Sequence, residues 1–252
     1  MIRSFLENVT RTWKLKRRLP SSYGKVPIMI TPSGGLKYLV KSMDAIDPML
    51  LRFCDGYVKP GSIVWDVGTN VGLFSVAAAA RATNSGKVFS FEPDVWLVQL
   101  LRRTVSMQPA TSAPMDILPV GVAGACGFMR FALAKRSRST NFLQGFGTDQ
   151  TGGIREMTTI YCVSLDWLSG NLPLPDVIKI DVEGAEASVL DGSHECFQKK
   201  RPIVFIEVAQ VNAEAVTSFF KKFDYRLYDG DQLGENLIPV ARAVANTLAI
   251  PN

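Results

Sequence analysis

The feature that most constrains this chain is a strand–turn–helix signal in its first third. Residues 63–67 are apolar apart from one carboxylate, Asp66, and favour a buried strand. Gly68 and Gly72 then allow a tight turn, and the apolar, alanine-rich run 76–80 favours a helix. In an open α/β sheet, ligands bind at the carboxyl ends of the strands, where such a turn lies. The stretch therefore predicts a ligand-binding α/β domain with a carboxylate beside the helix start.

A second acid follows at the end of the next predicted strand. Residues 87–91 are rich in strand formers, Glu92 closes the run, and Pro93 prevents its continuation. An acid at this place can accept both hydroxyls of an adenosine ribose. A dinucleotide fold would require G-x-G-x-x-G, but Asn70 stands at the middle glycine position. The turn therefore suits a cationic, phosphate-free ligand such as S-adenosylmethionine (SAM) better than a pyrophosphate.

The placement of charge and of cysteine disfavours several classes of protein. Residues 1–20 hold six Lys and Arg against one acid, so they carry the whole net charge of +5. A nucleic-acid-binding surface on the main domain is therefore not expected. The four cysteines form no C-x-x-C pair and the chain has one histidine, so we predict no metal site and expect free thiols in a reducing cytoplasm. No apolar stretch reaches the roughly 18 residues that would predict a transmembrane helix.

Apolar residues recur at helical spacing in residues 1–19, which predicts a basic amphipathic helix. Such a helix could make a peripheral contact with an anionic membrane surface, or bind an acidic partner. It could instead pack its apolar stripe on the domain or on a second subunit, and we favour this second interpretation. Residues 1–58 are thus predicted to be a lead-in segment and residues 59–252 the catalytic domain, with the oligomeric state left open.

A second informative stretch, residues 177–186, joins an apolar strand to an acidic helix start. Lys179 lies within the strand and Asp181 ends it, while Glu183 and Glu186 are expected to enter the helix. The strand should end beside the first one, so that Asp181 would face the pocket at the glycine turn. A group of acids around one crevice can shift pKa values enough to provide a base. We interpret Glu186 as stabilising the helix dipole.

Two further segments supply candidates for binding the acceptor. Glu207 lies in a predicted strand at 201–208, near its end. Residues 135–153 are polar, basic and rich in glycine, and a loop of this length in a compact domain is usually functional or disordered. We predict a lid or substrate loop there, with disorder as the alternative. The substrate-binding candidates are Lys179, Glu207 and Asn141.

Five motifs, taken in order, resemble the FkbM family of SAM-dependent methyltransferases. They are D-V-G-T-N-V-G from Asp66, F-E-P from Phe91, S-L-D from Ser164, K-I-D-V-E-G-A-E from Lys179, and N-T-L-A-I from Asn246. The resemblance implies a Rossmann-like class I α/β fold: a mostly parallel seven-stranded sheet with an antiparallel last strand and helices on both faces. Residues 117–122 predict its third core strand. Residues 127–133 and the loop after them predict an inserted β segment.

The resemblance also implies SAM as methyl donor and O-methylation of a hydroxyl on a sugar, a glycolipid or another small natural product. SAM would be held by Asp66, Gly68, Asn70, Gly72 and Glu92. Asp181 and Glu183 would border the methyl group and the acceptor. We hypothesise that Asp181 removes the acceptor's proton while Glu183 orients the acceptor or the SAM amino group. A divalent ion held by Asp181, Glu183 and Glu207 is a weaker hypothesis, since three acids alone do not establish a site.

Two alternatives to a methyltransferase stay open. A sensor or scaffold would bind SAM without consuming it over a broad panel of acceptors. A dinucleotide-dependent oxidoreductase is disfavoured by the residues of the glycine turn. The one histidine, His194, matches no motif of the family, and we favour a packed or helix-surface position for it over the role of a base.

Overall fold

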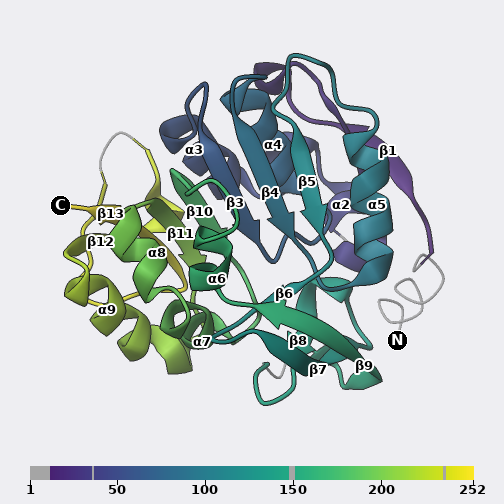
Figure 1. Ribbon diagram of the computed structural model, residues 1–252. Coiled ribbons are helices and arrows are strands. Elements are labelled where there is room, and N and C mark those ends of the chain that lie inside the picture. The colour runs from purple at the N-terminus through teal and green to yellow at the C-terminus, as the bar shows by residue number, and fades with distance from the viewer. Residues whose placement is uncertain (1–11, 36, 148–150, 235–236) are drawn as a thin grey trace.

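A computed structural model describes residues 12–35, 37–147, 151–234 and 237–252 (Figure 1). Its centre is a seven-stranded sheet in the order β12-β13-β11-β10-β3-β4-β5. The strands are β3 (Ile63–Val67), β4 (Lys87–Phe91), β5 (Met115–Leu118), β10 (Val177–Ile180), β11 (Ile203–Glu207), β12 (Tyr225–Asp229) and β13 (Asn246–Pro251). In this sheet, β13 is inserted between β11 and β12 and runs antiparallel to both. The other neighbouring strands pair in parallel. The predicted mostly parallel sheet with an antiparallel last strand is confirmed.

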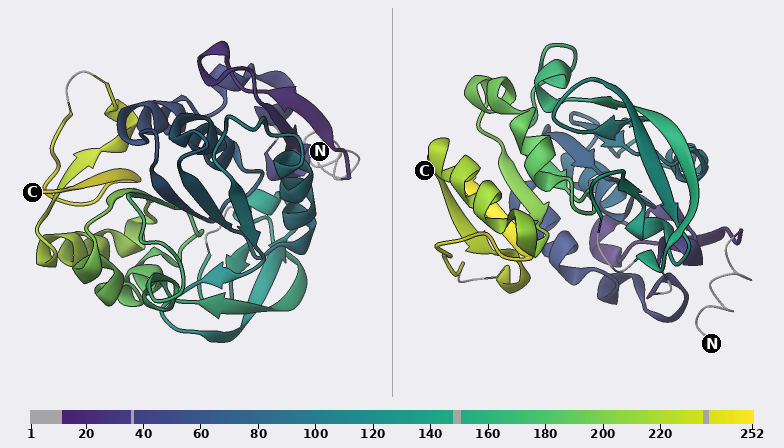
Figure 2. Two further views of the ribbon diagram at one scale, coloured as in Figure 1. Left: turned by 45° about the horizontal axis from the view of Figure 1, so that its top comes forward. Right: turned by 90° about the horizontal axis from the view of Figure 1, so that it is seen from below.

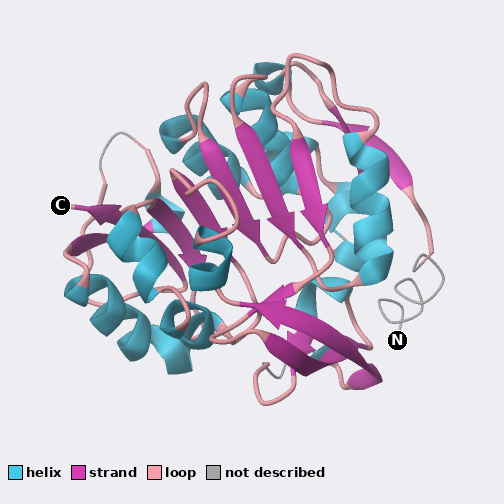
Figure 3. Cartoon of the chain, viewed as in Figure 1, coloured by secondary structure: helices cyan, strands magenta, loops and turns pink. Residues whose placement is uncertain are grey.

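Helices cover both faces of this sheet (Figure 3). One face packs against α3 (Pro48–Tyr57), α4 (Leu73–Ala82) and α5 (Val95–Val105). The other packs against α6 (Leu165–Ser169), α7 (Glu186–Asp191), α8 (His194–Lys199) and α9 (Ala213–Lys222). Successive strand residues alternate between these two cores: Val64 belongs to the first and Trp65 to the second, both fully buried. A strand buried on both faces requires the near-continuous apolar sequence seen in residues 63–67.

A second, smaller sheet is inserted between β5 and β10 and lies beside the main one (Figure 2). Its strands are β6 (Gly121–Val122), β7 (Gly127–Ala134), β8 (Phe142–Leu143) and β9 (Ile154–Val163), in the order β6-β9-β7-β8. The prediction of one strand over 117–122 is wrong, because β5 ends at Leu118 and β6 begins in the other sheet. Pro119 between them has no N–H for the ladder, so the chain leaves the main sheet there.

Residues 15–30 form a hairpin, which differs in part from the helix predicted over residues 1–19. β1 (Leu15–Arg18) pairs antiparallel with β2 (Pro27–Ile30), so the prediction is wrong for residues 15–18, and residues 1–11 lie outside the described part. The alternating exposure of β1 explains the difference: with period two, half of its residues face the domain. The short helix α2 (Lys37–Val40) follows. A peripheral contact through residues 1–19 stays a prediction.

Other features of the described residues bear on the sequence predictions. The side chains before residue 59 share a core with the main sheet, since Phe53 lies 5.6 Å from Phe74 and 5.2 Å from Phe205, ring centre to ring centre. Three of the four free cysteines are buried, and Cys126 is exposed. No described helix is both long and apolar enough to cross a membrane.

Candidate functional site

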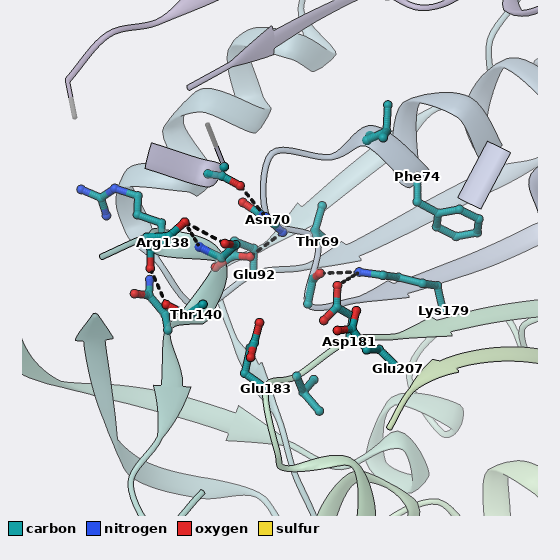
Figure 4. Close-up of a pocket in the computed structure, with 18 of the residues that line it drawn as sticks. Thr69, Asn70, Phe74, Glu92, Arg138, Thr140, Lys179, Asp181, Glu183 and Glu207 are labelled. Atoms are coloured by element: carbon teal, nitrogen blue, oxygen red, sulfur yellow. Dashed lines mark hydrogen bonds and ion pairs between the residues drawn. The ribbon is translucent and has the colours of Figure 1, made fainter. Parts of the chain in front are cut away.

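A cavity of about 490 Å³ opens at the carboxyl ends of β3, β4, β10 and β11. Figure 4 shows side chains from all four strand ends pointing into it. Two segments far away in sequence also contribute to its walls, one around Gly34 and Tyr38 and the other at residues 136–141. The cavity therefore lies where a parallel sheet is expected to bind a ligand.

The glycine turn after β3 forms the floor of the cavity. Gly68 has φ 76°, and a Cβ placed there would lie 1.7 Å from the carbonyl oxygen of Asp181. No other residue fits, since the turn passes directly beneath the end of β10. Asn70 also has a positive φ, of 53°, and Gly72, with φ 87°, is the N-cap of α4. Gly72 does not line the cavity; a Cβ on it would contact Leu101 at 2.5 Å, so it permits close packing of α4 on α5.

The carboxylate of Glu92 holds the turn from the neighbouring strand. Its Oε2 accepts a hydrogen bond from the Asn70 backbone N–H at 2.7 Å, and its Oε1 accepts one from the Asp94 N–H at 2.9 Å. The side chain lines the cavity and is only 5% exposed. Burial raises the pKa of Glu92 to about 8, although its hydrogen bonds partly oppose that rise. Each oxygen retains a lone pair that a ligand hydroxyl could use.

Beneath the turn, Asp66 and Lys179 form a buried network. Asp66 is 0% exposed and does not line the cavity; it accepts a hydrogen bond from the Ser75 hydroxyl at 2.5 Å. The Lys179 ammonium lies 3.4 Å from Asp66, 3.1 Å from Asp181, and donates to the Gly68 carbonyl at 2.7 Å. Burial alone would lower the pKa of Lys179, but the Asp181 and Asp66 carboxylates outweigh it and raise that pKa. Asp66 thus acts on the cavity through Lys179.

Three carboxylates face the opposite end of the cavity: Asp181, Glu183 and Glu207 (Figure 4). Burial, with the charges of Asp181 and Glu207, raises the pKa of Glu183 to about 8. The charge of Asp181, helped by burial, raises the pKa of Glu207 to about 7. The prediction that Glu183 enters the helix is wrong, because α7 begins at Glu186 and Glu183 occupies the preceding turn with φ 51°. No three His, Cys, Asp or Glu side chains in the described ranges converge as a metal site would require.

The loop after β7 forms part of the cavity wall with residues 136–141. Arg138 forms a buried ion pair with Asp94 and lies 4.5 Å above the ring of Trp96. Asn141, a predicted substrate-binding residue, is 9% exposed: its amide donates to Asp94 at 3.1 Å and accepts from the Ala134 N–H at 2.9 Å. Both residues therefore anchor the loop to the start of α5. The described part of this loop contains a short 3-10 turn, Arg138–Thr140, and β8, and residues 148–150 lie outside the description. The role of a lid stays a prediction.

The sequence analysis missed several residues that line the cavity. Tyr38 of α2 is 3% exposed, and burial with the nearby charges of Asp47 and Asp181 raises the pKa of its phenol. Lys37 donates to Asp47 at 2.6 Å at the same wall. Neither residue belongs to a recognisable pattern in the sequence. Arg138 stood in a polar run whose residues have no period, so nothing distinguished it from its solvated neighbours.

Comparison with known proteins agrees with this site. The family model of the methyltransferase FkbM domain matches residues 66–227, which is more than half of the chain. The chain belongs to the FkbM methyltransferase family. FkbM methyltransferases are SAM-dependent, so the family supports SAM over a dinucleotide as the ligand of this cavity.

Similar proteins include a curated relative and two solved structures. Hexuronic acid methyltransferase AglP of Haloferax volcanii is 29% identical over 162 residues, 64% of this chain and 62% of the relative's length. An FkbM methyltransferase structure from Methylobacillus flagellatus is 14% identical, with 86% of this chain and 58% of that chain covered and a TM-score of 0.48. A SAM-dependent O-methyltransferase structure from Thermotoga maritima is 15% identical, with 89% and 73% covered and a TM-score of 0.44.

The cavity of this FkbM methyltransferase has the donors, acceptors and space that SAM requires. The side-chain oxygen of Asn70 is buried and accepts no hydrogen bond from the described residues, so it is free for a donor on the cofactor. Gly68 keeps the floor open, and the free lone pairs of Glu92 suit a ribose. Gly68, Asn70 and Glu92 would therefore hold SAM directly, whereas Asp66 and Gly72 would act from behind the cavity wall.

Proposed function

We propose that this methyltransferase transfers the methyl group to a hydroxyl oxygen of a sugar, carried on a glycan or another small molecule. The observation that carries the proposal is the group of carboxylates, Asp181, Glu183 and Glu207, at the end of the cavity away from Glu92. A sugar hydroxyl is a poor nucleophile, and carboxylates can both accept its proton and bind neighbouring hydroxyls. The relative named for hexuronic acid supports a sugar as the acceptor class.

Within this group we assign proton removal to Glu183, in place of the earlier assignment to Asp181. Asp181 already forms an ion pair with Lys179 at 3.1 Å, so its carboxylate is engaged in the network beneath the turn. Glu183 has no ion pair among the described residues, and its pKa is raised to about 8. A carboxylate with a raised pKa takes up a proton more readily once it is ionised. Asp181 and Lys179 then orient the reacting groups.

The protein's part in the reaction is alignment and proton removal. When bound, SAM supplies a methyl group activated by its sulfonium, so that the new C–O bond forms as the C–S bond breaks. The hydroxyl proton goes to Glu183, and no further reactant is needed. Holding the hydroxyl in line can contribute about 7–11 kcal/mol in the most favourable intramolecular cases. The loop anchored by Arg138 and the wall formed by Tyr38 would restrict the access of water.

The proposal predicts how turnover depends on pH. Glu183 must be ionised to accept a proton, so kcat should rise with pH and level off above the pKa of about 8. Below it, kcat should fall about tenfold per pH unit. Glu183→Gln should lower kcat by about 10²–10⁴-fold and abolish this rise. Asp181→Asn should also lose turnover, but its residual rate should keep the rise with pH.

The test combines calorimetric titration of SAM with transfer of labelled methyl groups to neutral glycosides and to hexuronates. Both variants should bind SAM within a few-fold of wild type, and Glu195→Gln, an exposed acid on α8, serves as the matched control. Normal turnover by Glu183→Gln would end the assignment of the base. SAM binding without consumption over the whole panel would instead favour the sensor or scaffold alternative.

A further inference from the structure

Glu186 makes more contacts than stabilisation of a helix dipole requires. It lies in the first turn of α7 and is 2% exposed. Its Oε1 accepts a hydrogen bond from the Gly184 backbone N–H at 2.6 Å. Its Oε2 accepts one from the Asn212 side-chain amide at 2.6 Å and another from the Ala209 N–H at 3.3 Å. Three donors around one buried carboxylate hold it in a single orientation.

These donors come from two different loops, and each loop carries an acid of the cavity. Gly184 directly follows Glu183 in the turn after β10, while Ala209 comes two residues after Glu207 at the end of β11. Asn212 strengthens the link, because its amide also donates to the Gly184 carbonyl at 2.8 Å. One carboxylate and one amide thus join the two loops behind the acceptor end of the cavity, which is the end at which Asp181, Glu183 and Glu207 lie.

The turn that carries Glu183 requires such support. Glu183 has φ 51° and Gly184 has φ 100°, and a left-handed conformation costs a residue other than glycine about 1–3 kcal/mol. On its other side, the turn lies against the inserted segment, since a Cβ on Gly184 would lie 2.9 Å from the Gly147 N. A strained conformation persists only where its surroundings determine it fully.

We propose that Glu186 and Asn212 are positioning residues that hold the Glu183 carboxylate at the acceptor end of the cavity in reach of the acceptor hydroxyl. The inference rests on the proposed function, in which Glu183 removes the proton. Neither residue lines the cavity, so neither touches the acceptor itself. Their effect on turnover passes through the backbone of Gly184.

Asn212→Ala is the primary test because it leaves the charge of the site unchanged. The variant removes the links to Glu186 and Gly184, and a shift of about 1 Å in a reacting group can cost on the order of 10²-fold in rate. We expect kcat to fall by about that factor while the Kd for SAM stays within about two-fold. Asn171→Ala is the matched control, because its amide also donates to a backbone carbonyl, that of Trp167, but outside the cavity. It should behave as wild type.

Glu186→Gln adds a readout that a purely structural role would not change. The groups facing Glu183 are Asp181, Glu207, Glu186 and Lys179, and the charge of Glu186 helps to raise the pKa of Glu183. The glutamine side chain lacks that charge, and its NH₂ group would face a donor on one of the two loops, where the carboxylate accepted a hydrogen bond. The rise of kcat should therefore move to lower pH while the plateau falls. Glu195→Gln should change neither.

A double variant checks that the two side chains act together. Asn212→Asp alone sets two carboxylates against each other and should lower kcat further than Asn212→Ala. Adding Glu186→Gln lets the new amide donate to the new carboxylate, so the double variant should recover at least about fivefold over Asn212→Asp. Circular dichroism and SAM titration of each variant confirm that it is folded.

The outcomes separate this inference from the proposed function. Asn212→Ala and Glu186→Gln with wild-type kcat and pH profile, beside an inactive Glu183→Gln, would overturn the positioning role and leave the assignment of the base intact. An active Glu183→Gln would overturn the proposed function, and the positioning role with it. A fall in SAM affinity equal to the fall in kcat would show a general structural effect and also count against the inference.

Discussion

The two ends of the cavity are built in different ways. At the cofactor end, Gly68, Asn70 and Glu92 belong to one strand–helix–strand unit. The Gly68 N–H donates to the Phe91 carbonyl, and the Asn70 N–H donates to Glu92. At the acceptor end, acids from β10 and β11 meet a tyrosine from α2. The loop held by the pair Arg138–Asp94 lies beside Glu92 instead. The first end depends on local backbone geometry, whereas the second depends on contacts between segments distant in sequence. The two should therefore fail in different ways.

Gly68→Ala should have the largest effect and should damage both ends. The left-handed φ alone costs about 1–3 kcal/mol, and the new Cβ would lie 1.7 Å from the Asp181 carbonyl, so β10 must move. We expect loss of SAM binding by calorimetry and a clearly lower midpoint of denaturant unfolding. Gly56→Ala is the control, because nothing lies within 4 Å of its Cβ and α3 favours alanine. A stable Gly68→Ala protein that binds SAM would refute the role given to the turn.

Arg138→Met should come next and tests the loop at residues 136–141, which lies beside Glu92. Removing one member of a buried ion pair costs about 3–5 kcal/mol, because the Asp94 charge is left uncompensated. Unfolding should show this loss, and the affinity for SAM should fall, because the loop lies beside Glu92. Adding Asp94→Asn should restore part of the stability, since asparagine can still cap α5 through the Trp96 N–H. If the double variant is less stable than Arg138→Met, the ion pair is not what holds the loop.

Glu92→Ala should affect the cofactor end alone. Its removal leaves the Asn70 and Asp94 N–H groups without their acceptor, at a cost of about 1–3 kcal/mol. The ribose of SAM also loses the carboxylate that would accept from its hydroxyls, so SAM affinity should fall on the order of 10–100-fold in a calorimetric titration. The rate at saturating SAM should change much less, because no carboxylate of the acceptor end is altered. A fall in kcat at unchanged SAM affinity would break the distinction between the two ends.

His194→Phe should have the smallest effect. His194 stacks on Phe219 at 5.5 Å and contacts Phe223 at 5.6 Å, ring centre to ring centre, and it does not line the cavity. A phenyl ring can occupy the same place, so stability should change by less than about 0.5 kcal/mol. The pH profile of kcat should be that of the wild type. A profile that flattens would assign a proton-transfer role to His194.

The sequence predictions succeeded where a function depends on consecutive residues. The glycine turn, the acid at the tip of β4 and the position of Asp181 beside β3 followed from strand patterns and the rule that parallel strands end at one edge. The prediction of a helix at residues 15–18 failed because an apolar residue every few positions fits a half-buried strand as well. The break at Pro119 could have been found from the missing N–H alone.

The sequence by itself determined the fold class, the family and the residues at the strand ends, because those features follow from local pattern and from backbone rules. Only the tertiary structure decided which carboxylates are paired. Lys179 lies between Asp66 and Asp181, and Glu186 joins two loops through Asn212. Glu183 has no such partner among the residues that the structure describes. Pairing depends on distances of a few ångströms between segments that are far apart in the chain, and in a buried site those distances determine whether an acid holds or releases its proton.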